Sequence, residues 1–356
     1  MGYGKEEKAL IWLDSFSLDY AKKAAALSHA RDPYALVARF SEDKALSGIL
    51  GEEKYAEMRL TLSDGGYLRG LLASYEKKGI VCVTCLSALY PEELRAIPDP
   101  PFVLYCRGRT ELLRERRFAI VGSRRTLPQV MRRTEEFSER LGEYFAIVTG
   151  LADGGDSAAA EGALKKGRVI SVLAYGLDHV YPECNRDLLR RVEKSGLAVS
   201  EYIPSQPPKK YLFSARNRII AGLSEGVLVV SGGLKSGTRI TAECAYSYGR
   251  DVFAFPYGIG VKSGEGCNRL IKEYAKLTDD LVDISAVFGI NLTEKEEESL
   301  TPAEKKIVDF LSEGAAHVSE IARAAGMKES ELAPLLVLLQ MKGRVVSCGG
   351  NRWAKA

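Results

Sequence analysis

Short apolar runs alternate with amphipathic segments through the middle of the chain. The runs are rich in Val, Ile, Phe and Tyr, and from Phe118 onward they alternate with segments whose apolar positions have helical spacing. They are IVCVTCL, FVLYCRG, FAIVGS, FAIVTG, RVISVLAYG, LAVSEY, GVLVVSG and VFAFPYG. Because these runs are continuously apolar, we predict a mostly parallel sheet covered by helices on both faces. The sequence therefore predicts an α/β, Rossmann-like core over roughly residues 110–289.

The two ends of the chain carry a different pattern, in which helical spacing dominates. Residues 1–70 predict a small helical domain of the SAM or helix-hairpin-helix kind, with a plain helix-loop-helix as the alternative. Residues 71–290 predict the extended Rossmann-like domain, and the acidic stretch TEKEEES predicts a linker over 291–299. Residues 300–356 predict three helices and a hairpin with a Gly-Gly turn, which is typical of a winged-helix domain.

Charge and composition narrow the functional classes. The 356 residues include 50 basic and 47 acidic side chains, a formal net charge of +3, so a site for a polyanion must be a local patch. No apolar run approaches the roughly 18 residues of a membrane span, and the N-terminus MGYGKEEKAL lacks the apolar region of a secretory signal. We therefore expect a cytoplasmic protein.

Cysteines and histidines offer little metal or redox chemistry. The seven cysteines are odd in number and scattered, as expected in a reducing compartment. Cys82 and Cys85 form one CxxC, which is compatible with zinc or redox chemistry, but it lies in a predicted strand without a second ligand pair. His29, His179 and His317 lie far apart in the sequence. We expect neither a metal nor a cofactor.

The loop FAIVGSRR combines a strand end, a glycine turn, a hydroxyl and two guanidiniums. Gly122, Ser123, Arg124 and Arg125 precede a helix predicted near Pro128. Backbone N–H groups in such a turn, the positive end of the helix and the arginines favour phosphate. The alternative is a surface turn with two solvated arginines. The dinucleotide pattern GxGxxG is absent here.

Two other loops follow predicted strands. In TGLADGGDSAAAEGAL, Gly150 allows close approach of the backbone. Asp156 in the same loop is predicted to cap the next helix, with a catalytic carboxylate as the alternative. In YGLDHVYPECNRDL, Asn185 either caps a helix or contacts a ligand, and the sequence leaves both open.

The segment FSARNRIIAGLS places two arginines at a predicted helix start. Arg216 and Arg218 flank Asn217, and positions two apart on a helix diverge by about 200°. We therefore predict that one arginine faces the ligand and the other ties the helix to a neighbouring loop or subunit. Phe213 either stacks on a base or belongs to the core.

The loop GGLKSGT predicts a second anion-binding helix start, formed by Ser236 and Gly237 beside Lys235. No strong nucleophile–base pair or metal set accompanies these loops. The pattern favours a protein that binds a phosphate chain over a catalyst.

Motifs over roughly residues 65–290 resemble the DprA/Smf family of DNA-processing proteins. They are AIVGSRR, TGLADGGDSAAAEGAL, YPECN, SEY, FSARNRIIAGLS, SGTRITAE and GRDVFAFP, in that family's order. The upstream YPEELRAIPDPPFVLYCRG and the two flanking domains also match the family plan.

The resemblance implies a dimeric, nonenzymatic protein that binds and protects single-stranded DNA. It also implies that the protein brings this DNA to the recombinase RecA in natural transformation. The DNA-binding residues implied are Ser123, Arg124, Arg125, Arg216, Asn217, Arg218, Lys235, Ser236 and Gly237. In the winged-helix domain, the presumed recognition helix ELAPLLVLLQMKG is nearly uncharged, which suits protein contact better than a DNA groove.

Three positions depart from the family pattern. Glu161 stands where a His is usual, Ser231 where an acidic residue is usual, and Tyr257 where a Gly follows Pro256. All three are expected near the DNA cleft.

An enzyme is the alternative hypothesis. SGGLKSGTRITAE also resembles, with insertions, the PGGxGTxxE motif of nucleotide phosphoribohydrolases. Glu243 and Arg216 would then act on an N-glycosidic bond, but the proline is missing and the spacing is broken.

Overall fold

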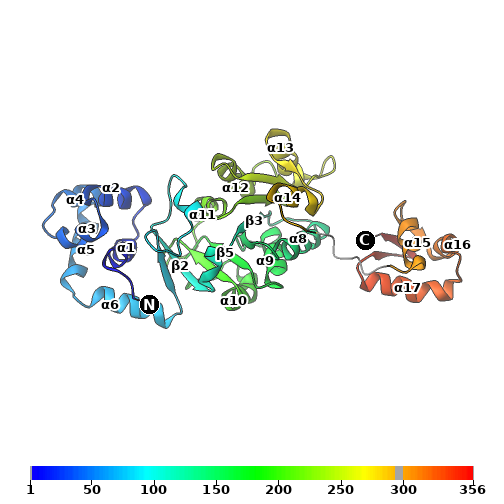
Figure 1. The fold of residues 1–356 in the computed structure, drawn as a ribbon, viewed down its shortest axis with the longest axis horizontal. Helices are drawn as coiled ribbons and strands as arrows, with labels where there is room; N and C mark the ends of the chain where they lie inside the picture. Colours follow the sequence, from blue (N-terminus) through cyan, green and yellow to red (C-terminus); the bar gives the residue numbers. More distant parts are fainter. Residues whose placement is uncertain (1, 293–299, 356) are drawn as a thin grey trace. The chain divides into compact units, whose positions relative to one another are not determined.

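The computed structural model describes residues 2–292 and 300–355 and divides the chain into two compact units, Met1–Leu292 and Thr293–Ala356 (Figure 1). Most of the predicted linker, residues 293–299, lies outside the described residues. Among the described helices, none has the length and apolar character needed to cross a membrane.

A nine-stranded sheet forms the centre of the first unit, in the order β1-β2-β6-β5-β4-β3-β7-β8-β9. Strand β2 is antiparallel to β1 and β6, and the remaining pairs are parallel, so the predicted mostly parallel sheet is confirmed. Each predicted run contains a strand, whereas the two-residue β9 is too short to leave a pattern. The strands are β1 Val81–Thr84, β2 Val103–Gly108, β3 Arg117–Val121, β4 Ala146–Thr149, β5 Val169–Leu173, β6 Leu197–Ser200, β7 Gly226–Val229, β8 Asp251–Ala254 and β9 Lys276–Leu277.

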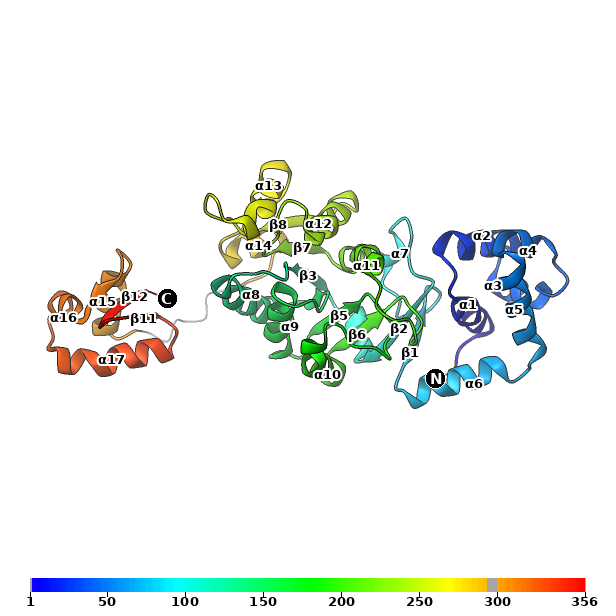
Figure 2. The same ribbon diagram turned by 180° about the vertical axis from the view of Figure 1, so that it is seen from behind.

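Helices cover both faces of this sheet (Figure 2). One face packs on α8 Pro128–Leu141, α9 Gly155–Leu164, α10 Arg186–Ser195 and α14 Leu281–Phe288. The other packs on α7 Glu92–Arg95, α11 Lys210–Leu223, α12 Gly237–Ser247 and α13 Glu265–Glu273. Short 3₁₀ helices lie at Thr110–Arg114, Glu183–Asn185 and Lys262–Gly264.

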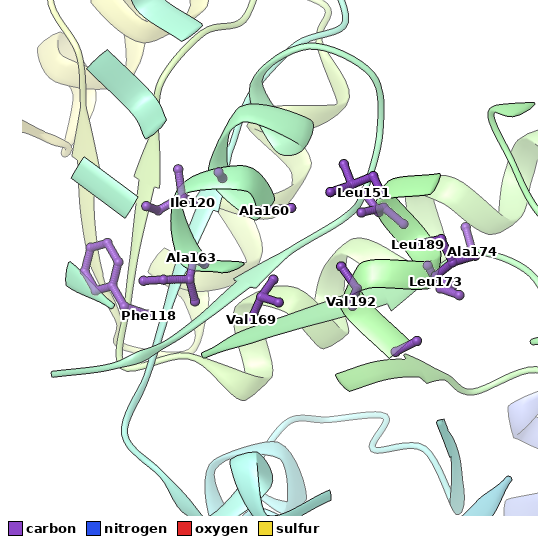
Figure 3. Close-up of a cluster of buried hydrophobic side chains, with 14 of the residues drawn as sticks. Phe118, Ile120, Leu151, Ala160, Ala163, Val169, Leu173, Ala174, Leu189 and Val192 are labelled. Carbon is purple, nitrogen blue, oxygen red and sulfur yellow. The ribbon is translucent and has the colours of Figure 1, made fainter. Parts of the chain in front are cut away.

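Successive side chains of β3 show why its sequence is apolar after Arg117. Phe118 and Ile120 belong to the first core, which Figure 3 shows around α9 and α10, whereas Ala119 and Val121 belong to the second. Since side chains alternate across a strand, two covered faces require apolar residues at every position.

The N-terminal segment folds into helices, as predicted. They are α1 Lys5–Asp14, α2 Tyr20–Ala30, α3 Pro33–Arg39, α4 Ala45–Leu50, α5 Glu52–Ser63 and α6 Tyr67–Lys77. Helix α6 runs across residue 70, where the sequence suggested a boundary. The buried Asp14 accepts hydrogen bonds from Tyr105 Oη (2.9 Å) and Lys23 Nζ (2.6 Å), which joins these helices to β2. Asp19 and Asp32 cap α2 and α3.

The second unit has the predicted winged-helix plan. Helices α15 Pro302–Leu311, α16 Val318–Ala325 and α17 Glu329–Met341 precede strands β11 Val345–Gly349 and β12 Arg352–Lys355. A short strand, β10 Ala316–His317, completes a three-stranded sheet in the order β10-β12-β11. Ile307, Ile321 and Leu336 lie in its separate apolar core.

Candidate nucleic-acid interface

A cleft of about 320 Å³ opens at the carboxyl ends of β3 and β7. The chain proceeds from β3 through β4 and β5 to β6 on one side, then places β7 on the other side of β3. Helices α8 and α12, which follow β3 and β7, therefore cover opposite faces. Open α/β sheets bind ligands at such a reversal of strand order.

The cleft brings most predicted site residues together. Its walls come from the loops after β3 and β4, from α11 and from the start of α12. The predicted residues that line it are Gly122, Ser123, Arg124, Phe213, Arg216, Asn217, Ser236 and Gly237. Four others, Arg125, Gly150, Arg218 and Lys235, are not among its lining residues.

The first two backbone N–H groups of the GSRR turn are used within the protein. Gly122 N donates to Asp156 Oδ1 at 2.9 Å, and Ser123 N donates to Ser231 Oγ at 2.8 Å. The prediction that these groups are open to phosphate is therefore wrong. Glycine is still required at position 122, because a Cβ there would lie 2.7 Å from the Cα of Gly155.

The two arginines of this turn are solvent-exposed. Within the described part of the chain, neither Arg124 nor Arg125 pairs with a carboxylate. The Arg124 guanidinium carbon lies 5.8 Å from the ring centroid of Tyr181 and 5.9 Å from that of Phe213. Phe213 is half-buried against the core and also lines the cleft, so both roles left open by the sequence are structurally possible.

Hydroxyl groups hold the turn against the end of β7. The fully buried Ser231 contacts Thr126 Oγ1 at 2.5 Å and Ser123 Oγ at 3.2 Å through its own hydroxyl. Nearby, Tyr257 Oη donates to the Val230 carbonyl at 2.6 Å. Glu161 pairs with Arg191; like Ser231 and Tyr257, it is not among the residues that line the cleft.

Asp156 and Arg216 form the buried floor of the cleft. Asp156 does not cap α9, whose N-cap is Gly154; it accepts from Gly122 N and from Ala152 N (3.3 Å). Burial raises the pKa of Asp156, and the Arg216 guanidinium opposes that rise. Burial likewise lowers the pKa of Arg216, although a guanidinium remains charged at neutral pH.

Arg216 lies inside α11, not at its start. The helix begins at Lys210, and its N-cap Lys209 follows Pro207 and Pro208, so the predicted helix start was several residues late. The Arg216 side chain is 4% exposed and donates to the Gly150 carbonyl (2.8 Å) and to that of Val172.

Gly150 forms part of the same floor. A Cβ on Gly150 would lie 2.6 Å from both Arg216 Nη2 and Asp156 Oδ2, so only glycine leaves room for the two charged groups.

Arg218 points away from Arg216, as the 200° divergence predicts. Its guanidinium donates to Asp99 Oδ2 (2.7 Å) and to both carboxylate oxygens of Glu201 (3.1 and 2.7 Å). It therefore ties α11 to two neighbouring loops, and its charge is balanced by carboxylates.

The start of α12 is arranged as the sequence indicated. Ser236 caps the helix, accepting from Thr238 N at 3.3 Å, and Gly237 is its first residue. Asn217 Nδ2 donates to the Gly237 carbonyl at 3.1 Å, which fixes α11 against α12. Lys235 is exposed, without a carboxylate partner among the described residues.

Asn185 joins two loops. Its Nδ2 donates to the Leu151 carbonyl and to Ser157 Oγ, both at 3.0 Å, and its side chain makes no capping bond to α10. The sequence analysis assigned no role to Tyr181, two residues after His179 in the same loop, although an aromatic residue in a strand-to-helix loop was a signal that could have been used.

The residues required by the enzyme hypothesis do not come together. Arg216 lines the cleft, but Glu243 does not, and its carboxylate pairs with Arg239 at 3.2 Å. Within residues 2–292 and 300–355, no group of His, Cys, Asp and Glu side chains has the arrangement of a metal site. All seven cysteines are free thiols, including Cys82 and Cys85.

The fold and the cleft define a doubly wound α/β protein with an arginine-bordered site at its strand reversal and a separate winged-helix unit. The chain belongs to the DNA recombination-mediator protein A (DprA/Smf) family, whose model matches residues 81–289. The DprA winged helix domain matches residues 293–351. The resemblance inferred from the motifs is thus confirmed.

Relatives support this assignment. The chain is similar to DNA processing protein DprA of Streptococcus pneumoniae, 42% identical over 204 residues, which are 57% of this chain and 72% of that protein. A crystal structure of that species' protein aligns with a TM-score of 0.68 and 33% identity, covering 80% and 98% of the two chains. DNA processing protein A from Helicobacter pylori aligns with a TM-score of 0.54 and 31% identity, covering 58% and 95%. Its structural study concerns the single-stranded DNA binding mode of that protein.

Proposed function

We propose that this protein binds single-stranded DNA along the cleft at the ends of β3 and β7, and that it acts by binding and not by catalysis. Arg124, Arg125 and Lys235 would hold phosphates, Phe213 would stack on a base, and Ser236 and Gly237 would border the DNA path. Arg216, Asn217 and Gly150 would shape the floor of the cleft, while Arg218 would fix α11.

One observation supports this proposal in a chain whose net charge is only +3. Arg124 lines the cleft, Arg125 and Lys235 adjoin its lining residues in sequence, and these exposed cations have no carboxylate partners among the described residues. Elsewhere in the first unit many arginines are paired, as Arg116 is with Glu225 and Arg168 with Glu115. Unpaired cations beside an aromatic ring suit a flexible polyanion whose bases are accessible. Membership of the family and the Helicobacter pylori relative support the same ligand.

Fluorescence anisotropy with single-stranded and double-stranded oligonucleotides of equal length tests the proposal. Three phosphate contacts from Arg124, Arg125 and Lys235 predict a slope of log K against log salt near −2, since each contact on a single strand contributes about −0.7. Affinity for the single strand should then fall about twentyfold when salt rises fourfold. Equal affinity for duplex and single strand, or binding insensitive to salt, contradicts the proposal.

The finer function is delivery of this DNA to RecA during natural transformation, in the cytoplasm. Family membership supports this step. Filament formation by RecA on protected single-stranded DNA should begin sooner when this protein is present than without it. The Arg124→Ala variant is the control, because it should bind DNA more weakly while keeping its fold. Acceleration by that variant equal to the parent's would contradict delivery through the cleft.

We propose further that the protein is a homodimer through the Rossmann-like core. The segment 245–260 presents Tyr246, which is 60% exposed and stacks on Tyr274 at 4.2 Å, and the fully exposed Ile259. Light scattering of the parent at micromolar concentration should give twice the chain mass, and Ile259→Asp should reduce it. Leu60→Asp, at another exposed apolar residue on α5, is the matched control. A strictly monomeric parent that still binds DNA would refute the dimer.

A further inference from the structure

Three side chains from three separate segments meet beside the cleft. Arg124 comes from the loop after β3, Tyr181 from the loop after β5, and Phe213 from α11. The rings of Tyr181 and Phe213 have centroids 5.3 Å apart and planes inclined by 60°. The Arg124 guanidinium lies within 6 Å of both rings, at 5.8 Å and 5.9 Å.

Tyr181 has no evident role in holding the fold together. Its side chain is 37% exposed and belongs to none of the apolar cores, whereas Phe213 packs against the central one. In the described parts of the chain, the Tyr181 hydroxyl makes no hydrogen bond. The backbone is nevertheless fixed, because the buried Tyr175 donates its hydroxyl to the Tyr181 carbonyl at 2.8 Å. An exposed aromatic ring on an anchored backbone loses little freedom when it binds a ligand.

We propose that Tyr181 forms, with Phe213, a subsite for one unpaired nucleobase beside the phosphate held by Arg124. This subsite rests on the proposed binding of single-stranded DNA and adds a residue that lies outside the lining of the cleft. Two inclined rings offer an apolar surface to any base, so the subsite is tolerant of sequence. In this arrangement the Arg124 guanidinium lies near the two rings and would also bind the phosphate next to the stacked base.

The competing explanation is that Tyr181 only holds Arg124 in position. The two explanations differ in their dependence on the base. A ring that stacks on a base contributes nothing to a strand without bases, whereas a ring that positions Arg124 contributes equally to both strands.

The experiment compares Tyr181→Ala, Tyr181→Phe and the parent on a thymine oligonucleotide and on an abasic oligonucleotide of the same length. Tyr181→Ala should weaken binding to the thymine strand roughly 5- to 150-fold, the effect of one lost base–aromatic stack. It should change binding to the abasic strand less than about twofold and leave the salt slope unchanged. Tyr181→Phe should bind both strands like the parent, because it keeps the ring. Tyr34→Ala is the matched control, since Tyr34 is also exposed and has a cation, Lys5, 5.4 Å from its ring.

Each result decides the matter. Equal losses by Tyr181→Ala on both strands overturn the subsite and leave Tyr181 as a residue that positions Arg124. Normal binding of the thymine strand by Tyr181→Ala overturns it as well. If the parent itself fails to bind single-stranded DNA, the proposed function fails and this proposal fails with it, whereas an inert Tyr181→Ala beside a binding parent removes the subsite alone.

Discussion

Replacing Arg216 by alanine should destabilise the first unit, although the sequence suggests a surface residue that contacts phosphate. The side chain is 4% exposed and donates to the carbonyls of Gly150 and Val172. It also opposes the burial-induced rise in the pKa of Asp156. Alanine would leave two carbonyls without this donor and a buried carboxylate without its cation.

The loss of stability can be estimated from these contacts. Each of the two buried carbonyls left without its donor costs about 1–3 kcal/mol, and the buried carboxylate of Asp156 also loses the favourable electrostatic effect of Arg216. Because one side chain supplies all of these interactions, the terms overlap, and we expect about 3–5 kcal/mol in total. For a unit of about 290 residues, an unfolding entropy of about 2.1 cal/mol/K per residue means that each kcal/mol lowers Tm by about 1.6 °C, so the expected fall is about 5–8 °C.

Thermal unfolding followed by circular dichroism measures this loss, with Arg125→Ala as the exposed control. Adding Asp156→Asn to Arg216→Ala should recover part of the stability, because the amide keeps an acceptor for Gly122 N and removes the isolated charge. The reasoning is refuted if Arg216→Ala melts with the parent yet loses DNA affinity and reduces the salt slope by about one unit. That outcome would make Arg216 a phosphate ligand.

The pH dependence of the same variant follows from the Asp156 pKa. Burial raises this pKa in the folded parent, and removal of Arg216 should raise it further. A raised folded-state pKa favours folding when the group is protonated, and this stability is lost as pH rises through the folded-state pKa. The difference in Tm between parent and Arg216→Ala should therefore increase as pH rises from below the ordinary aspartate pKa through the raised folded-state pKa. A difference that shrinks over this interval would contradict the assignment.

Three further predictions concern other parts of the chain. In anisotropy titrations, Arg124→Ala should lower the affinity for single-stranded DNA about tenfold or more and reduce the salt slope by about one unit, while Tm stays unchanged. Arg69→Ala, at another exposed arginine, is the control and should bind like the parent. Removal of residues 294–356 should leave single-strand affinity largely unchanged, because α17 presents few cations; a large loss with the core still folded would move DNA recognition to the winged helix. Hydrogen bonds from Thr301 N (2.7 Å) and Lys342 Nζ (3.0 Å) lower the pKa of Glu304. The ionised carboxylate therefore stabilises the second unit at pH values above the ordinary glutamate pKa. This stabilisation is lost as pH falls through the folded-state pKa. In calorimetry, the unfolding transition of the second unit is the one that disappears when residues 294–356 are removed. Glu304→Gln should lower the temperature of this transition at neutral pH, and the difference from the parent should shrink in acid. A difference that does not change with pH would contradict this.

Most of the fold could be predicted from local pattern. The apolar runs mark β1 to β8 because each strand is covered on both faces, which makes most positions apolar whatever the partner strand is. Pro128 marks the start of α8, since proline fits the first turn of a helix. The start of α11 was misplaced because its Pro-Pro boundary was passed over in favour of the basic residues further along.

The candidate site was predictable in its location but only partly in its chemistry. Strand-to-helix loops of a doubly wound sheet lie at one edge, so the sequence predicted a ligand site among loops such as GSRR and GGLKSGT. Only the tertiary structure placed β7 beside β3. The tertiary structure alone decided which polar groups remain open to a ligand. Gly122 N and Ser123 N are occupied by side chains 34 and 108 positions away in the chain. The Arg216 guanidinium likewise donates a hydrogen bond to a carbonyl 66 positions away. Such pairings arise because folding removes these groups from water and requires partners for them, and the partners come from whichever segments the sheet order brings close.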